Sequence, residues 1–134
     1  MSLSTDAADL SLRMMYGADH AALIGATITV QLGTLDVDGL FVELPAVTYL
    51  GYASAAVANN GTVFPAPASG LLESAEIDVC TATGDWPDAP THARTLDGAT
   101  VLDTVALDTT TGAVPLDGDT VTVILAFFYD PNVE

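Results

Sequence analysis

From residue 23 onwards, the chain alternates short apolar runs with turns that are rich in Asn, Asp and Gly. These turn residues tolerate positive φ angles, so they favour tight turns and hairpins. The turns recur about every 8–12 residues, which is the strand spacing of a sandwich or a small barrel. The turn sequences are DVDG, NNG, LDGA, TTTG and LDGD. The sequence therefore predicts an all-β fold, an antiparallel β-sandwich (jelly-roll-like) of about eight strands.

The expected strands follow the alternation of apolar and polar residues. In the first run, ATITVQLG, alternation places Ile28, Val30 and Leu32 on one face. Residues 47–57 are expected to form one long strand that a glycine interrupts. Further strands are expected in LFVEL, SAEIDVCTA, THARTLD, TVLDTVALD and VTVILAFFYD, and VFPAPASG is expected to be extended and broken by proline.

One helical signal precedes the strands, in STDAADLSLRMMYG. A Ser or Thr can cap its start, and Gly17 can end it. Leu10 and Met14 lie at helical spacing, so they are candidate interface residues of a short amphipathic helix or a docking arm. A chain of 134 residues fits one domain. We therefore expect an N-terminal arm or short helix at 1–22 and a β-sandwich domain at 23–134.

The charge balance excludes several partners. The chain has 18 acidic and 2 basic residues and a net charge of −16. Such a surface repels nucleic acid and anionic membranes, so we expect neither as a partner. The acidity fits either the solubility of an apolar chain or a saline setting. The longest apolar run, residues 121–129, is shorter than the ~20 residues of a membrane-spanning helix, and the acidic N-terminus is unlike a signal peptide. These features predict a soluble protein.

Candidate catalytic residues are few. His20 and His92 are the two histidines, and Cys80 is the one cysteine. No nucleophile motif such as GxSxG surrounds any of them. Cys80 has no partner for a disulfide within the chain, and its strand-like surroundings predict a buried thiol. We therefore expect no enzyme activity, no catalytic residues and no cofactor.

Two acidic turns are candidate cation sites. Asp36 and Asp38 lie in one, and Asp117 and Asp119 lie in the other. Neither turn has the spacing of a complete calcium-binding loop, so we expect hairpin turns and no metal. A carbohydrate- or calcium-binding β-module that uses Trp86 and these turns stays open as an alternative.

The stretch TATGDWPDAPTHARTLDG holds the one tryptophan and one of the two arginines. Trp86 lies where a strand gives way to a loop, and an aromatic ring there typically closes the end of a sandwich core. Arg94 is expected to be a structural guanidinium that pairs with one of the many carboxylates. Both residues are therefore candidates for structural or interface roles.

The last apolar run carries apolar side chains on both faces. Alternation places Val121, Val123, Leu125 and Phe127 on one face and Ile124 and Phe128 on the other. Apolar residues on both faces indicate burial on both sides. In a small sandwich the second face would be buried by another subunit, so we expect a homo-oligomer, with a trimer favoured.

Three segments carry a resemblance to a known family: ATGDW (82–86), PTHARTLDGATVLDTVAL (90–107) and LDGDTVTV (116–123). Their order resembles a recurrent segment of tailed-phage virion proteins, of the head-decoration and tail-fibre-like kinds. The upstream pieces ATITVQLG and YLGYASAAV are similar to that family's first strand and its tyrosine-bearing strand. The resemblance implies a β-sandwich domain built into a virion, with no catalytic residues.

The resemblance and the charge together favour a capsid decoration (cement) protein. Such a protein would lie on the outer surface of a tailed-virus head, contact the major capsid protein and stabilise the shell. Residues 1–22 would then tie it to the shell or to a neighbouring subunit. A tail-fibre, baseplate or turret component that contacts the host surface is the alternative location.

Overall fold

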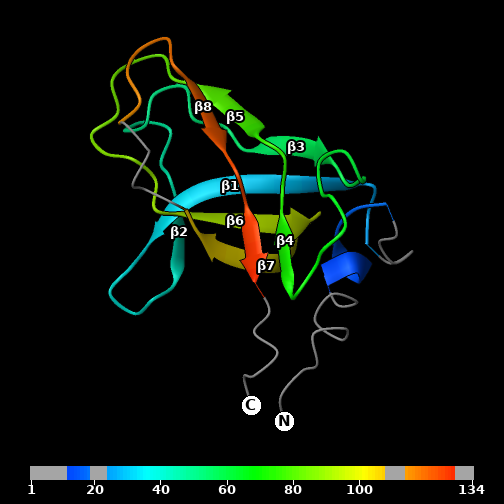
Figure 1. Cartoon of the computed structure of the whole chain (residues 1–134). Coiled ribbons are helices and arrows are strands. Elements are labelled where there is room, and N and C mark those ends of the chain that lie inside the picture. The colour runs from blue at the N-terminus through cyan, green and yellow to red at the C-terminus, as the bar shows by residue number, and fades with distance from the viewer. Residues whose placement is uncertain (1–11, 19–23, 108–113, 129–134) are drawn as a thin grey trace.

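The computed structural model describes residues 12–18, 24–107 and 114–128. These residues form nine strands and one short helical turn at 12–15 (Figure 1). The strands are β1 (Thr27–Leu35), β2 (Phe41–Glu43), β3 (Ala55–Ala58), β4 (Leu71–Glu73), β5 (Ile77–Thr81), β6 (His92–Asp97), β7 (Thr100–Ala106), β8 (Thr120–Val123) and β9 (Ala126–Phe128). Every pairing between them is antiparallel. The predicted all-β, antiparallel, sandwich-like fold is confirmed.

The larger sheet is built around β1. Its strand order is β2-β1-β6-β7, and β3 also pairs with β1. Residues 27–30 of β1 pair with β3, and residues 33–35 pair with β2, so both short strands share the edge of β1 that faces away from β6. The β6–β7 hairpin closes through Gly98, which has a φ of 59°. The N-terminal half of β1 therefore lies beside β3, and its C-terminal end lies beside β2 and the β1–β2 turn.

The second layer consists of two strand pairs, β4-β9 and β5-β8. One hydrophobic core joins both layers, because inward residues of the larger sheet belong to the same buried cluster as inward residues of the two pairs. The alternation expected for Ile28, Val30 and Leu32 is confirmed, since all three are fully buried.

Residues 47–57 do not form the single strand that we expected. Residues 46–51 lie in turns, and the strand in this region is β3. Tyr49 and Tyr52 are both buried, whereas residues three apart on a strand point to opposite faces. The turn allows both tyrosines to face the core, because the chain reverses at Gly51, which has a φ of 86°. A Cβ at this position would collide with the carbonyl oxygen of Thr81, so the turn requires glycine.

The last apolar run is divided into two strands where we expected one. β8 pairs with β5, and β9 pairs with β4, a strand that the sequence did not indicate. The division lies at Leu125, whose N–H donates to Ser74 Oγ (2.9 Å) and whose carbonyl accepts from Ser74 N–H (2.8 Å). These bonds replace strand pairing at Leu125 and leave the inward–outward alternation intact.

The helical turn buries Leu12 and Tyr16 in the core of the sandwich. Leu12 and Tyr16 are 0% and 1% exposed, whereas Met14 is 48% exposed. Residues 12 and 16 share one helix face, and Met14 lies about 200° around the axis from each. Met14 is therefore exposed and stays a candidate interface residue, whereas Leu10, the other candidate, lies outside the described residues. Because Leu12 and Tyr16 belong to the sandwich core, a boundary at residue 22 does not separate residues 12–18 from the domain.

Candidate interaction surfaces

Trp86 closes one end of the sandwich, as its position in the sequence predicted. The side chain is 3% exposed, and its Nε1–H donates to the carbonyl oxygen of Leu50 (2.9 Å). Tyr49 and Tyr52 meet the indole edge-on, with ring centroids 5.4 and 6.5 Å away. The backbone N–H of Trp86 also donates to Pro115 O (2.9 Å). A buried indole offers no open face for a sugar ring, so the structure gives the carbohydrate-binding alternative no support at this residue.

The two tyrosines beside Trp86 act as fixed hydrogen-bond donors. Tyr49 donates to Asp88 Oδ1 (2.6 Å), and this bond together with burial raises the pKa of Tyr49 to about 12. Tyr52 donates to Glu43 Oε2 (2.6 Å) and accepts from Leu32 N–H (3.1 Å). Burial and then the bond to Glu43 raise the pKa of Tyr52. Both phenols therefore stay protonated at neutral pH and tie the loop 45–52 to its neighbours.

Arg94 is structural, but its partner differs from the expected carboxylate. Its Nε–H and Nη2–H donate to Gln31 Oε1 (2.9 and 2.6 Å), and its guanidinium lies 4.6 Å from the ring centroid of Phe41. Gln31 is directly opposite Arg94 in the β1–β6 register, so its amide is the nearest acceptor. The guanidinium is therefore held over the sheet by a cross-strand amide and a ring.

No hydrogen bond joins His92 to Cys80, the two candidate catalytic residues within the part of the chain that the structure describes. His92 lies in β6, and its Nδ1 is 2.9 Å from Thr91 Oγ1. Cys80 is half-buried in β5, and burial raises the pKa of its thiol, so the reactive thiolate is disfavoured. His20 lies outside the described residues. Within residues 12–18, 24–107 and 114–128, no group of three His, Cys, Asp or Glu side chains is placed to hold a metal ion.

The acidic turns use their carboxylates to shape the backbone. Asp36 Oδ1 accepts from the N–H groups of Asp38 (2.9 Å) and Leu40 (3.0 Å). At the other turn, Asp119 Oδ2 accepts from Leu116 N–H (2.9 Å). These bonds shape the tight turns that the sequence predicted. The first turn closes the β1–β2 hairpin, whereas the second leads into β8, which pairs with β5.

Three exposed apolar side chains lie on the outer face of the β4-β9 pair and just before β9, and this face also carries the exposed Glu73 opposite Ala126. The predicted inward residues Val121, Val123, Leu125 and Phe127 are all buried. Ile124 and Phe128 point outward and are 50% and 62% exposed. Leu71 is directly opposite Phe128 in the register and is 40% exposed. We call Leu71, Ile124 and Phe128 the β4–β9 strip.

A polar network joins the helical turn to the larger sheet. The Tyr16 hydroxyl lies 2.8 Å from Thr95 Oγ1 and donates to Asp103 Oδ2 (2.7 Å). Burial raises the pKa of Asp103, and the bond from Tyr16 partly opposes that rise. Asn59 Oδ1 accepts from Gly17 N–H (2.6 Å), which holds the residue that ends the turn. Tyr16 was not among the predicted site residues, although its i, i+4 spacing from Leu12 places both residues on one helix face.

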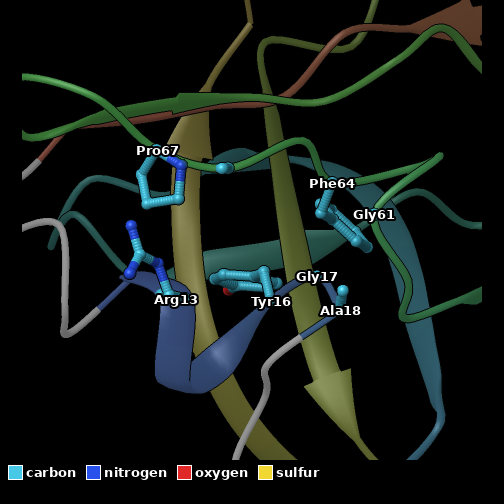
Figure 2. A pocket seen from close by; sticks show the side chains of 8 residues that line it. Arg13, Tyr16, Gly17, Ala18, Gly61, Phe64 and Pro67 are labelled. Carbon is cyan, nitrogen blue, oxygen red and sulfur yellow. The ribbon is translucent and has the colours of Figure 1, made fainter.

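A pocket of about 180 Å³ opens between the helical turn and the loop 61–67 (Figure 2). The rings of Tyr16 and Phe64, whose centroids are 5.1 Å apart, and Pro67 are buried behind the lining. Ala18 and Ala66 are its exposed apolar side chains. Arg13 is the charged residue of the lining, and its side chain is exposed. In the part of the chain that the structure describes, no hydrogen bond or ion pair engages the Arg13 guanidinium. The pocket therefore combines apolar walls with an available cation.

Comparisons with family models, curated proteins and solved structures gave no match to this chain. None of the helical residues that the structure describes belongs to a helix long and apolar enough to cross a membrane. The surface features that bear on function are therefore the β4–β9 strip, the pocket beside Arg13 and the acidic turns.

Proposed function

We propose that this protein is a capsid decoration (cement) protein, without enzyme activity, on the outer surface of a tailed-virus head. In this role it forms a homo-oligomer, with a trimer favoured, and contacts the major capsid protein. The observation that carries the proposal is the β4–β9 strip, an outward-facing apolar surface on a chain of net charge −16. An exposed apolar strip surrounded by polar surface is typical of a contact between proteins.

The strip has the chemistry of a surface that another subunit covers. Phe127 and Phe128 are neighbours in β9, yet Phe127 is 1% exposed and Phe128 is 62% exposed. Phe127 fills the core, whereas Phe128 and its cross-strand partner Leu71 face water. Burial of these two side chains against a second protein would stabilise the complex. In the proposed assembly, that protein is a neighbouring subunit of the shell.

The net charge favours a position outside the shell. A surface of net charge −16 repels packaged DNA, which carries one negative charge per phosphate. The sequence resemblance to tailed-phage virion proteins supports the same assignment. Its best segment, residues 82–86, ends in the buried Trp86, which fits a structural role for that segment.

Quantitative mass spectrometry of purified particles tests the proposal. A decoration protein is present in amounts comparable with the major capsid protein, whereas a tail-fibre, baseplate or turret component is present in a few copies. Detection at fibre-like copy number would move the protein to the tail, and its absence from particles would overturn the virion assignment.

Reattachment to heads that lack the protein tests the β4–β9 strip itself. Phe128→Ser removes an exposed ring, so the fold is kept while attachment weakens. Val47→Ser is the matched control, because Val47 is also exposed but lies in the turn 46–51. Attachment of Phe128→Ser at the wild-type level would show that the strip is not the contact surface.

A further inference from the structure

The β1–β2 hairpin ends in a hydrogen-bonded turn with an exposed valine at its tip. Val37 is fully exposed and lies between Asp36 and Asp38. The Asp36 carboxylate accepts two backbone N–H groups, and Gly39 N–H donates to Asp36 O (3.0 Å). The carboxylate of Asp38 makes no hydrogen bond or ion pair within the described residues. The tip thus presents one apolar side chain and one available carboxylate on a hydrogen-bonded turn.

The pocket beside Arg13 has the complementary chemistry. Its volume of about 180 Å³ is below the ~300–1,000 Å³ of small-molecule sites, so it suits a single side chain. The exposed side chains of Ala18 and Ala66 provide apolar contact, and Arg13 lines the same pocket. Arg94, the other arginine, is already engaged with Gln31 and Phe41. Arg13 is therefore the cation of this chain that is placed to receive a carboxylate.

The tip and the pocket lie at opposite ends of β1. The tip follows Leu35, the last residue of β1. At the other end, Asn59 N–H donates to Ala26 O, and Asn59 Oδ1 accepts from Gly17 of the pocket lining. Figure 1 shows the hairpin and the helical turn at the two ends of the strand. Nine residues of strand span about 30 Å, so the tip of one molecule does not reach its own pocket.

We propose that copies of this protein bind head to tail, with Val37 of one copy inserted in the pocket of the next. In this contact the Asp38 carboxylate of the first copy pairs with the Arg13 guanidinium of the second. The two surfaces differ, so the interface is heterologous and closes into a ring, such as a trimer, when the rotation between copies allows it. The contact is a property of the chain alone and stands independently of the virion role.

Salt strengthens this association. Each copy carries a net charge of −16, so copies repel each other at long range. At about 0.1 M salt, the repulsion between charges more than ~10 Å apart is largely screened. The hydrophobic contact of Val37 with the pocket involves no charge, so salt does not screen it. The charges of Asp38 and Arg13 are in contact in the proposed complex, so salt weakens their attraction less than it weakens the long-range repulsion between copies.

Sedimentation of the full chain over a range of concentrations, at low and high NaCl, tests the contact. We expect reversible self-association that increases with salt. Val37→Ser raises the dissociation constant by about tenfold or more, since a buried valine is lost from the interface. Val47→Ser is the matched control, a similarly exposed valine outside both surfaces, and leaves the constant unchanged. A wild-type protein that stays monomeric under all conditions overturns the proposal.

Two further variants identify the partners within the contact. Arg13→Asp weakens association, and the double variant Arg13→Asp with Asp38→Arg restores it at the original net charge; circular dichroism confirms that each variant is folded. Failure of the double variant to recover overturns the pairing of these two residues. Association that is lost in Phe128→Ser but kept in Val37→Ser places the contact on the β4–β9 strip and overturns the proposal.

Discussion

The ring of Tyr16 stacks on the ring of Phe127, with centroids 4.3 Å apart and an angle of 23° between the planes. Tyr16 follows the helical turn near the start of the chain, and Phe127 lies in β9, the last strand. Phe64 contacts both rings, at 5.1 and 6.3 Å. The core of the sandwich therefore includes the N-terminal segment, and the two ends of the described chain stabilise each other.

This stacking predicts a large effect of removing the Tyr16 ring. Tyr16→Ala is expected to lower the free energy of unfolding by about 3–5 kcal/mol, because a fully buried aromatic ring is lost. Tyr16→Phe keeps the stack but leaves Thr95 and Asp103 without the hydroxyl, at a cost of about 1–3 kcal/mol. Urea denaturation measures both, with Met14→Ala as an exposed control within about 0.5 kcal/mol of the wild type. Similar losses for Tyr16→Ala and Met14→Ala would contradict this account.

The raised pKa of Asp103 predicts how the free energy of unfolding depends on pH. Burial raises its pKa in the folded state above the ordinary value of 3.8, so the folded state binds this proton more tightly than the unfolded state. The stability contribution is therefore fully present below 3.8 and falls as the pH rises from 3.8 to the folded pKa.

The Asp103→Asn variant isolates this contribution, because asparagine does not titrate. The wild-type free energy of unfolding minus that of Asp103→Asn should fall with rising pH and then level off. Urea denaturation at a series of pH values from about 3 to 7 measures the difference. Asp117→Asn corrects for the loss of one negative charge at an exposed turn. A difference that rises with pH would show that the carboxylate is favoured in the folded state.

Trp86 is expected to contribute to stability through packing at the end of the sandwich. Trp86→Ala should lower the free energy of unfolding by about 3 kcal/mol or more. Trp86→Phe keeps part of the contact with Tyr49 but leaves the Leu50 carbonyl without its donor, so the loss is smaller, about 1–3 kcal/mol. Circular dichroism follows unfolding in variants that lack the tryptophan. Wild-type stability of Trp86→Ala would refute the closing role of this ring.

Ser74 is expected to hold the junction between β8 and β9. Ser74→Ala removes the acceptor for the Leu125 N–H, which lies in a buried environment, and should cost about 1–3 kcal/mol. Hydrogen exchange of the Leu125 amide should accelerate more than exchange within β1, since the opening is local. Ser54→Ala, at an exposed position, serves as the control. Unchanged protection of Leu125 would mean that β8 and β9 are joined without this bond.

Much of the local structure was readable from the sequence. Gly39, Gly98 and Gly118 all adopt positive φ within turns that the sequence indicated, because glycine reaches that region without a steric penalty. The alternation from residue 121 to 127 survives the break between two strands, because a period of two residues fixes the inward face wherever the backbone stays extended. The same local logic placed Trp86 at the end of the core.

The candidate interaction surfaces were less readable, because they combine distant segments. Phe64 and Arg13 line one pocket, although neither carries a local signal that points to the other. Arg94 pairs with Gln31 because the β1–β6 register sets them opposite each other, while the composition had favoured a carboxylate.

The sequence by itself determined the turn chemistry, the acidic composition and the inward faces of β1 and of residues 121–127. The tertiary structure decided that Tyr49 and Tyr52 are both buried and that Leu12 and Tyr16 face the core. The physical reason is the distance along the chain over which each interaction acts. Turn propensity and alternation act over a few neighbouring residues, whereas the buried face of a short helical turn is selected by what the folded sheet offers it, here the ring of Phe127.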